Sequence, residues 1–229
     1  GQPGARIAFE FQPAALEIVL LTALALVLGG LVPRARELAR ARGHGLVTLN
    51  VGLAAVAVAP FGALVWTTGR IEVNEGLGYD GFRYAGMVEN GLSSGSPMNR
   101  MRPLVLVLAR IPYYFTQDVV RSFELLNYLF VFLEAYLLAK LGDLYGLGRF
   151  AKAYLVVSLA LCIATARMFA YYPVLIDLGA YVVVTLAVYA VLVAPRPAAA
   201  VAVCLAVVTR EFGVAAVLFG FHRDVRQGS

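Results

Sequence analysis

The sequence predicts an all-α integral membrane protein that forms a single transmembrane domain over residues 1–229. It is 61% hydrophobic and 14% charged, with a mean hydropathy of +0.78. A soluble domain usually carries about 25% charged residues. The charged residues also stand in short clusters between long apolar runs, as is typical of a protein that crosses a membrane several times. We therefore expect five to seven transmembrane helices and one re-entrant or interfacial helix.

The first two apolar runs set the predicted topology. Pro13–Val32 is long enough, at about 1.5 Å per residue, to cross the hydrocarbon core. Several arginines follow it between positions 34 and 42, and such loops stay on the cytoplasmic side. The second run, Leu46–Thr68, returns to the external side and ends near Trp66, a residue type favoured at the membrane interface. The N-terminus is then expected to be external.

The interval 69–101 is the longest polar stretch and is predicted to be an external loop. Within it, Asp80–Asn90 is expected to form a short amphipathic helix. Its side chains Phe82, Tyr84 and Met87 are expected to be available to lie on the membrane surface.

The next apolar run, Leu104–Phe115, is too short to cross the bilayer and is interrupted by Arg110. We interpret it as a re-entrant or interfacial helix on the external side. The alternative is a tilted full span, which would reverse the orientation of every later loop.

Three further spans are predicted after this short helix. Phe123–Leu141 carries Glu134 and leads inward to a basic loop, which is expected to be cytoplasmic. Tyr154–Phe169 then runs outward, and Val174–Ala194 runs inward again. A Pro-Arg-Pro turn at 195–197 follows on the inner side.

The last apolar stretch, Ala198–Phe221, is interrupted by Thr209, Arg210 and Glu211. It is either one span with a charged pair in its middle or a helical hairpin whose turn carries that pair. Positive charge on both flanks favours the hairpin.

Charged residues within or beside membrane helices point to a candidate site, because such residues are rare there and usually pair or serve a function. In the predicted topology four such groups converge on the external side. Guanidinium groups bind phosphate oxygens in a bidentate fork, so an excess of arginine suits a phosphate or pyrophosphate ligand. A carboxylate among them could act as a general base. The candidate residues are Tyr79, Asp80, Arg83 and Tyr84, then Arg100 and Arg102, then Arg167 with Asp177, and finally Arg210 with Glu211.

Structural roles compete with each of these assignments. Arg167 and Asp177 could pair between adjacent helices, and Arg100 could contact lipid phosphates, as could its neighbour Arg102. Asp80 could cap the short helix that follows it. The sequence leaves these alternatives open.

Several classes of function are not expected. The sequence has no GxGxxG, P-loop, HExxH or nucleophile-elbow motif, which disfavours a soluble nucleotide-using enzyme. The formal net charge is +5, but the basic residues stand mainly in loops, where they set topology and meet anionic lipids. We therefore expect the lipid bilayer, and not nucleic acid, as a partner. No cofactor is predicted, and the sequence does not support a divalent metal site.

Four short motifs, taken in order, resemble the GT-C superfamily of polytopic membrane glycosyltransferases, in a bacterial branch. They are GYDGFRYAGM, RMRPLVLVLAR, RMFAYYPVLIDLGAY and VVTREFGVAAVLF, within residues 46–226. Each motif is only moderately specific, and their order is the stronger signal.

The resemblance implies a GT-C-like core in the bacterial inner (cytoplasmic) membrane, with a polyprenyl-phosphate-linked sugar as donor at the external face. Asp80 would correspond to the carboxylate that deprotonates or orients the acceptor. Arg100, Arg102 and Arg210 would be candidates for holding the lipid phosphate. GT-C enzymes usually have more membrane helices, so the chain is expected to be a truncated, minimal or non-catalytic relative.

The alternative function is a non-catalytic transmembrane subunit packed in a larger membrane complex, for example an energy-transducing one. The apolar runs are rich in Ala, Gly and Val, which suits close helix–helix packing. Other membrane subunits would then be the partners. A transporter is less favoured, because no symmetric pair of broken helices is present.

Overall fold

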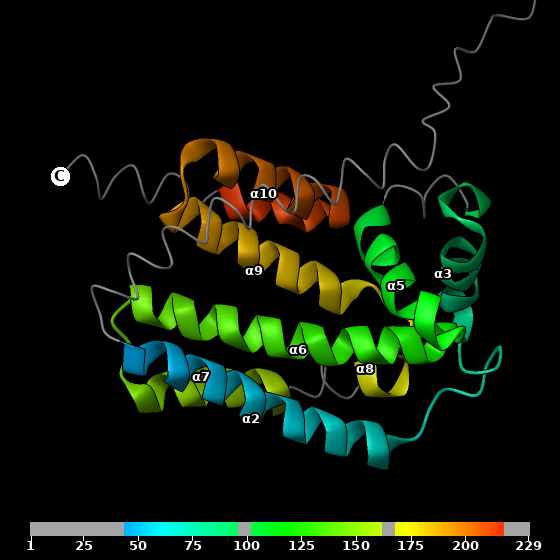
Figure 1. The fold of residues 1–229 in the computed structure, drawn as a ribbon, viewed down its shortest axis with the longest axis horizontal. Coiled ribbons are helices and arrows are strands. Elements are labelled where there is room, and N and C mark those ends of the chain that lie inside the picture. Colours follow the sequence, from blue (N-terminus) through cyan, green and yellow to red (C-terminus); the bar gives the residue numbers. More distant parts are fainter. Residues whose placement is uncertain (1–43, 96–101, 162–167, 218–229) are drawn as a thin grey trace, which may run out of the picture.

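The computed structural model describes residues 44–95, 102–161 and 168–217, and this part of the chain is all-helical, as predicted (Figure 1). The predicted first span, Pro13–Val32, lies outside the described residues. The α-helices are α2 (His44–Thr68), α3 (Gly78–Asn90), α5 (Pro103–Thr116), α6 (Val119–Leu144), α7 (Arg149–Leu161), α8 (Met168–Tyr171), α9 (Asp177–Val193) and α10 (Arg196–Thr209), and the 3-10 helices are η1 (Leu92–Ser94) and η3 (Glu211–Ala215).

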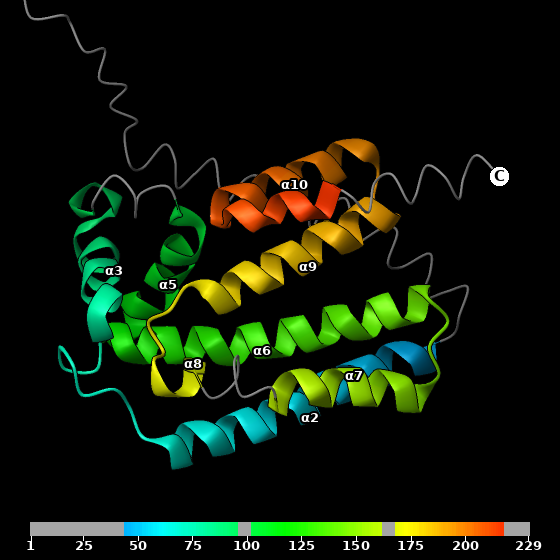
Figure 2. The same ribbon diagram turned by 180° about the vertical axis from the view of Figure 1, so that it is seen from behind.

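Helix α6 is the axis of the fold, and α2, α5, α7 and α9 all pack against it. Helices α2 and α7 lie on one side of α6, whereas α9 lies on the other side with α10 beyond it (Figures 1 and 2). Helices α3 and α5 stand together where α6 begins. We call this end of the molecule the site end, and we call the end where α6 meets α7 the opposite end.

The sequence explains why α6 is long and central. Asp118 precedes its first turn, and the Asp118 carboxylate accepts a hydrogen bond from the backbone N–H of Arg121, which is a standard N-terminal cap. From there the helix continues for 26 residues to Leu144. Phe123 and Phe130 are both buried on it, and its buried positions recur at helical spacing. Such a helix can carry neighbours on both sides.

Two helices of the described part are long and apolar enough to cross a membrane, namely Thr48–Thr68 and Val119–Leu144. Helix α9 has 17 residues, and α5 and α10 have 14 each. The described part therefore holds fewer such helices than the five to seven predicted for the whole chain. One reason is that α9 begins only at Asp177, because the three residues after Pro173 are not helical.

The short helices α3 and α5 lie close to their predicted positions. Helix α3 begins two residues before the predicted start at Asp80. However, the prediction that Tyr84 and Met87 lie on the membrane surface is wrong, because both side chains are buried inside the protein, and only Phe82 is exposed. Helix α5 matches the predicted run Leu104–Phe115 to within one residue at each end.

The final apolar stretch does not continue as one helix through its charged pair. Helix α10 ends at Thr209, Arg210 adopts an extended backbone, and η3 follows. The backbone N–H of Gly213 donates to the carbonyl of Arg210 at 2.9 Å. A Cβ atom at Gly213 would overlap the backbone of Ala206, so η3 lies directly against α10. The described residues thus form the charged turn that the hairpin interpretation requires.

A buried polar network joins three helices at the opposite end. The Lys152 ammonium on α7 donates to Asp143 of α6 at 2.7 Å and to Asn50 of α2 at 3.2 Å. The Asn50 amide donates to the second oxygen of Asp143 at 2.6 Å. The Lys152 side chain is only 2% exposed, and a buried charge of this kind is tolerated because both partners are satisfied.

We predict that Lys152→Met strongly destabilises the fold. Removing one member of a buried ion pair costs about 3–5 kcal/mol, because the other charge stays buried without its partner. The unfolding temperature of the purified protein in detergent micelles should fall. Arg149→Met is the matched control, since Arg149 is exposed on the same helix. Equal unfolding temperatures for the two variants would contradict the assigned role of the network.

Candidate functional site

The hydroxyl of Tyr172 organises the site end. Its oxygen accepts hydrogen bonds from the backbone N–H groups of Asp80 at 2.8 Å and Gly81 at 2.9 Å. The first amides of a helix have no partner within the helix, so Tyr172 acts as the cap of α3. The Asp80 side chain makes no capping hydrogen bond at the start of α3, which counts against the capping interpretation of this carboxylate.

Two glycines of the GYDG segment allow Tyr172 to approach. Gly78 has a φ of +68°, and a Cβ atom there would overlap the Tyr172 ring. A Cβ atom at Gly81 would lie 3.1 Å from Cβ of Val174. Part of the information in this motif is therefore structural, because its glycines make room for the segment that follows α8.

An ion pair joins α9 to the end of α10. The Arg210 guanidinium donates to the carboxylate of Asp177, the first residue of α9. The helix dipole also favours an acid in this first turn. Arg167, which the sequence analysis considered as a partner of Asp177, lies outside the described residues, and within the described part the partner of Asp177 is Arg210. The Nε atom of Arg210 is buried and has no hydrogen-bond partner within the described part of the chain.

Tyr84 lies at the centre of the charged groups. Its side chain is only 6% exposed, and this burial is the largest cause that raises the pKa of its phenol. The carboxylate of Asp80 raises that pKa further, Arg102 and Arg210 lower it, and Asp177 adds a smaller increase. All four charges therefore act on one phenol. We call these five residues the Tyr84 cluster.

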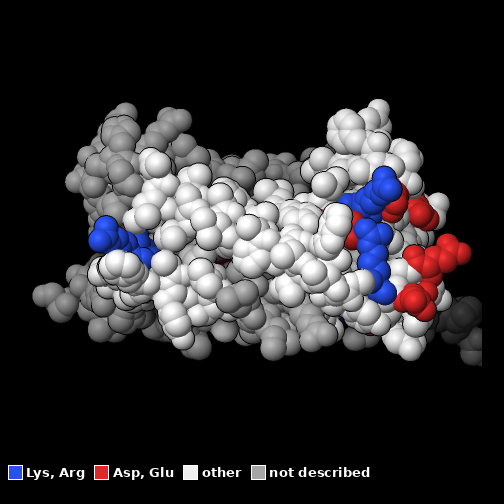
Figure 3. Space-filling model, turned by 90° about the horizontal axis from the view of Figure 1, so that it is seen from below, with Lys and Arg blue, Asp and Glu red and all other residues white. Residues whose placement is uncertain are grey.

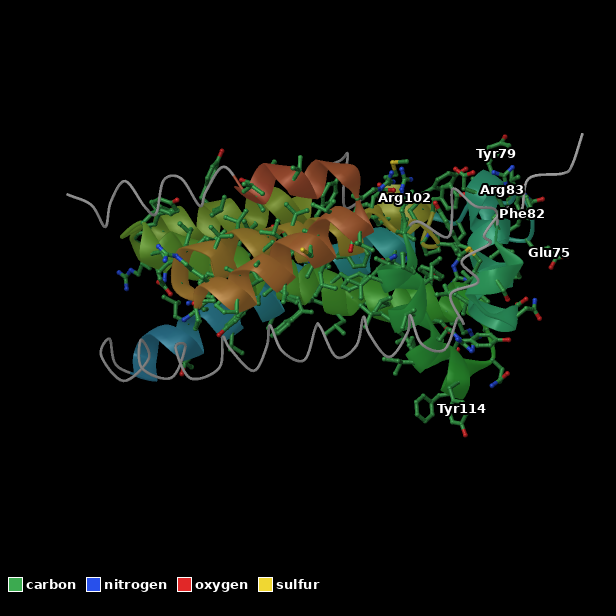
Figure 4. All side chains as sticks on the ribbon, turned by 90° about the horizontal axis from the view of Figure 1, so that it is seen from above. Glu75, Tyr79, Phe82, Arg83, Arg102 and Tyr114 are labelled. Carbon is green, nitrogen blue, oxygen red and sulfur yellow. The ribbon has the colours of Figure 1, made fainter. Side chains whose placement is uncertain are left out.

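Two predicted site residues point away from this cluster. In Figure 4, Tyr79 and Arg83 lie on the outer side of α3, whereas Arg102 lies between α3 and the end of α10. Tyr79 is 72% exposed, and the Arg83 guanidinium lies 5.5 Å from the centre of the Phe82 ring. The prediction that Tyr79 and Arg83 share a site with Arg102 is therefore not supported.

Other predicted residues cannot be placed in the same way. Arg100 and Arg167 lie outside the described residues, and only the backbone of Glu211 is described. Sequence reasoning missed the role of Tyr172, which appears there only within the motif RMFAYYPVLIDLGAY. The two glycines three positions apart in GYDG were the one available signal that another side chain approaches closely.

The cluster can perform two kinds of chemistry. Arg102 and Arg210 carry guanidinium donors suited to an anionic oxygen. Asp80 is exposed and can accept a proton from a molecule that approaches α3. In the described part of the chain, no three His, Cys, Asp or Glu side chains are grouped so that they could hold a metal ion.

On one face of the molecule the charged side chains lie toward the two ends. Seen from below, acidic and basic side chains gather at the site end, basic ones appear at the opposite end, and the surface between them is uncharged (Figure 3). Exposed aromatic side chains follow the helices to both ends, with Trp66 at the end of α2 and Phe115 at the end of α5. Phe150 and Tyr154 are exposed at the start of α7. Two aromatic zones of this kind are typical of the two interfaces of a membrane.

The pKa of Tyr84 provides a test of the cluster. Asp80→Asn should lower this pKa, because the removed carboxylate raises it, and Arg102→Gln should raise it, because the removed guanidinium lowers it. Phenolate absorbance during an alkaline titration measures the change, with the matching Tyr84→Phe protein subtracted to isolate one tyrosine.

Arg83→Gln is the control for this titration, because Arg83 is exposed and lies on the outer side of α3. It should leave the Tyr84 titration unchanged. A rise of the Tyr84 pKa in Arg83→Gln as large as that in Arg102→Gln would show that the effect comes from net charge and not from the cluster.

The chain has no match among protein-family models, curated proteins or solved structures.

Proposed function

We propose that this protein is a multi-pass membrane protein with a GT-C-like core, and that it transfers a sugar from a polyprenyl-phosphate donor at the external face of the bacterial inner membrane. The observation that carries the proposal is the Tyr84 cluster. Residues from α3, from the start of α5, from α9 and from the turn after α10 all act on one buried phenol. Such an arrangement could offer the Asp80 carboxylate and the guanidinium groups of Arg102 and Arg210 to one ligand.

In this proposal α6 runs across the bilayer and the site end is external. At about 1.5 Å per residue, its 26 residues exceed the thickness of the hydrocarbon core. The uncharged middle surface and the aromatic zones at the two ends support this orientation. The shorter helices α5 and η3 would then lie at the level of the outer leaflet or reach only part of the way across. The full five to seven spans would include Pro13–Val32.

Arg102 and Arg210 are the proposed contacts for the donor phosphate. Arg102 is half-buried directly before α5, and Arg210 is held in place by Asp177. A guanidinium that is already fixed by a carboxylate loses little freedom when it binds an anion, and its remaining N–H groups stay available for a second acceptor. Arg100, two residues before Arg102, would add a further positive charge.

Asp80 is the proposed general base. It is exposed, whereas Tyr84 one turn later on α3 is buried, so an acceptor hydroxyl could approach Asp80 from the external solution. The capping of α3 by the Tyr172 hydroxyl leaves the Asp80 carboxylate free of a capping role. General base catalysis is typically worth about 10²–10⁴ in rate.

We predict that Asp80→Asn lowers the rate of sugar transfer by about 10²–10⁴. The assay follows labelled sugar from a polyprenyl-phosphate donor into acceptor in membrane vesicles that contain the protein. Glu89→Gln is the matched control, because Glu89 is an exposed carboxylate at the other end of the same helix. Equal transfer by the wild type and Asp80→Asn would remove Asp80 from the mechanism.

One observation favours the alternative of a non-catalytic membrane subunit. The charges of Asp177 and Arg210 already neutralise each other, as expected for a protein whose polar residues serve packing. Absence of transfer by the wild-type protein, together with crosslinking of exposed α2 positions to another membrane protein, would favour this alternative.

A further inference from the structure

A lone carboxyl group lies in the middle of α6. Glu134 stands about 22 Å along the helix from its first residue at 1.5 Å per residue, and it is only 4% exposed. Between Glu124 and Lys140 on this helix, Glu134 is the one Asp, Glu, Lys or Arg residue in the sequence. Residues of this kind are costly inside a membrane and are therefore usually functional.

The polar contacts of Glu134 are incomplete. Its Oε1 atom accepts a hydrogen bond from the Thr185 hydroxyl of α9 at 2.7 Å. Its Oε2 atom is buried and has no hydrogen-bond partner within the described part of the chain. One oxygen of the group is thus held by a neighbouring helix, and the other is not.

Three of the helices packed against α6, namely α2, α7 and α9, supply no cation to this carboxyl group from their described residues. Helix α9 has no charged residue after Asp177, which is paired with Arg210 at the site end. Helix α2 has no Asp, Glu, Lys or Arg. Helix α7 carries Arg149 in its first turn and Lys152, whose ammonium is bonded to Asp143 at the opposite end.

We propose that Glu134 is a proton-binding site inside the membrane, held as a neutral carboxylic acid between α6 and α9. The contacts favour this form, because a carbonyl oxygen accepts from Thr185 while the other oxygen carries the proton. An ionised carboxylate would instead leave a buried charge without a counter-charge from the described residues of α2, α7 and α9, which is far less favourable than a neutral hydroxyl without an acceptor.

The proposal depends on the membrane position of α6 and not on sugar transfer. Release of the proton requires the carboxylate to meet water or a cation, and that requires α6 and α9 to separate near Thr185. A second buried polar atom without a partner, Oδ1 of Asn127, lies two turns closer to the site end on the same helix. Of these two groups only the Glu134 carboxyl can titrate, because Asn127 carries an amide. Glu134 is therefore the one that can exchange a proton when water enters between these helices.

Infrared spectroscopy of the wild-type protein in lipid vesicles at neutral pH tests the protonation state. The spectrum should contain the C=O stretching band of a protonated carboxylic acid, and Glu134→Gln should lose that band. Thr185→Val keeps the acid but removes the hydrogen bond, so the band should persist and move to higher frequency. A wild-type spectrum that matches Glu134→Gln in this region would overturn the proposal.

Dicyclohexylcarbodiimide tests access to the group from the lipid phase. The acid O–H adds across one C=N bond of this reagent, the oxygen bonds to carbon and the proton moves to nitrogen, which leaves a stable adduct after acyl transfer. Mass spectrometry should find the adduct on Glu134 in the wild type and its loss in Glu134→Gln. Glu124→Gln is the matched control, since Glu124 lies on the same helix near the site end and is ion-paired with Arg70. Labelling that disappears in Glu124→Gln but persists in Glu134→Gln would also overturn the proposal.

Neither the infrared nor the labelling measurement requires transferase activity, so failure of the proposed sugar transfer would leave both results interpretable.

Discussion

The arrangement of the site end depends on the two hydrogen bonds that the Tyr172 hydroxyl accepts from the first turn of α3. A buried amide without a partner costs about 1–3 kcal/mol, so two such bonds strongly favour one position of α3. That position turns Tyr84 inward, toward the charged ends of α9 and α10. The contact with Tyr172 needs glycine at position 78, because a Cβ atom there would overlap the Tyr172 ring. The GYDG segment, which looked like a chemical motif, therefore also serves a structural contact.

The ion pair between Asp177 and Arg210 gives the site end its second fixed point. It joins a helix start to a chain reversal, so the turn after α10 is held beside α9. The Arg210 guanidinium can bind a ligand while it stays paired with Asp177 only if the ligand supplies acceptor oxygens in addition to those of the Asp177 carboxylate. A phosphate with several oxygens meets this condition, because it can engage donors that the carboxylate leaves unused.

The sequence predicted the helical class and placed α5 and most of α6 closely, because apolar length and helix-breaking residues are local signals. It could not predict that Tyr84 and Met87 face inward, since an amphipathic pattern does not reveal whether protein or lipid covers the apolar side. It did not pair Asp177 with Arg210, because these two residues lie far apart in the chain and are brought close only by tertiary structure. The role of Tyr172 was missed for the same reason.

The polar groups of α6 differ in how completely they are hydrogen-bonded at its end and in its middle. At the opposite end, Asp143 is fully bonded to Lys152 and Asn50, and this network fixes α6 against α2 and α7. In the middle, Glu134 has one partner, and its second oxygen is buried without a partner among the residues that the structure describes. A helix anchored on one side but incompletely bonded on the other can separate from α9 without losing its contact with α2. In the proposal that Glu134 binds a proton, the interface between α6 and α9 is therefore where water would reach its carboxyl group.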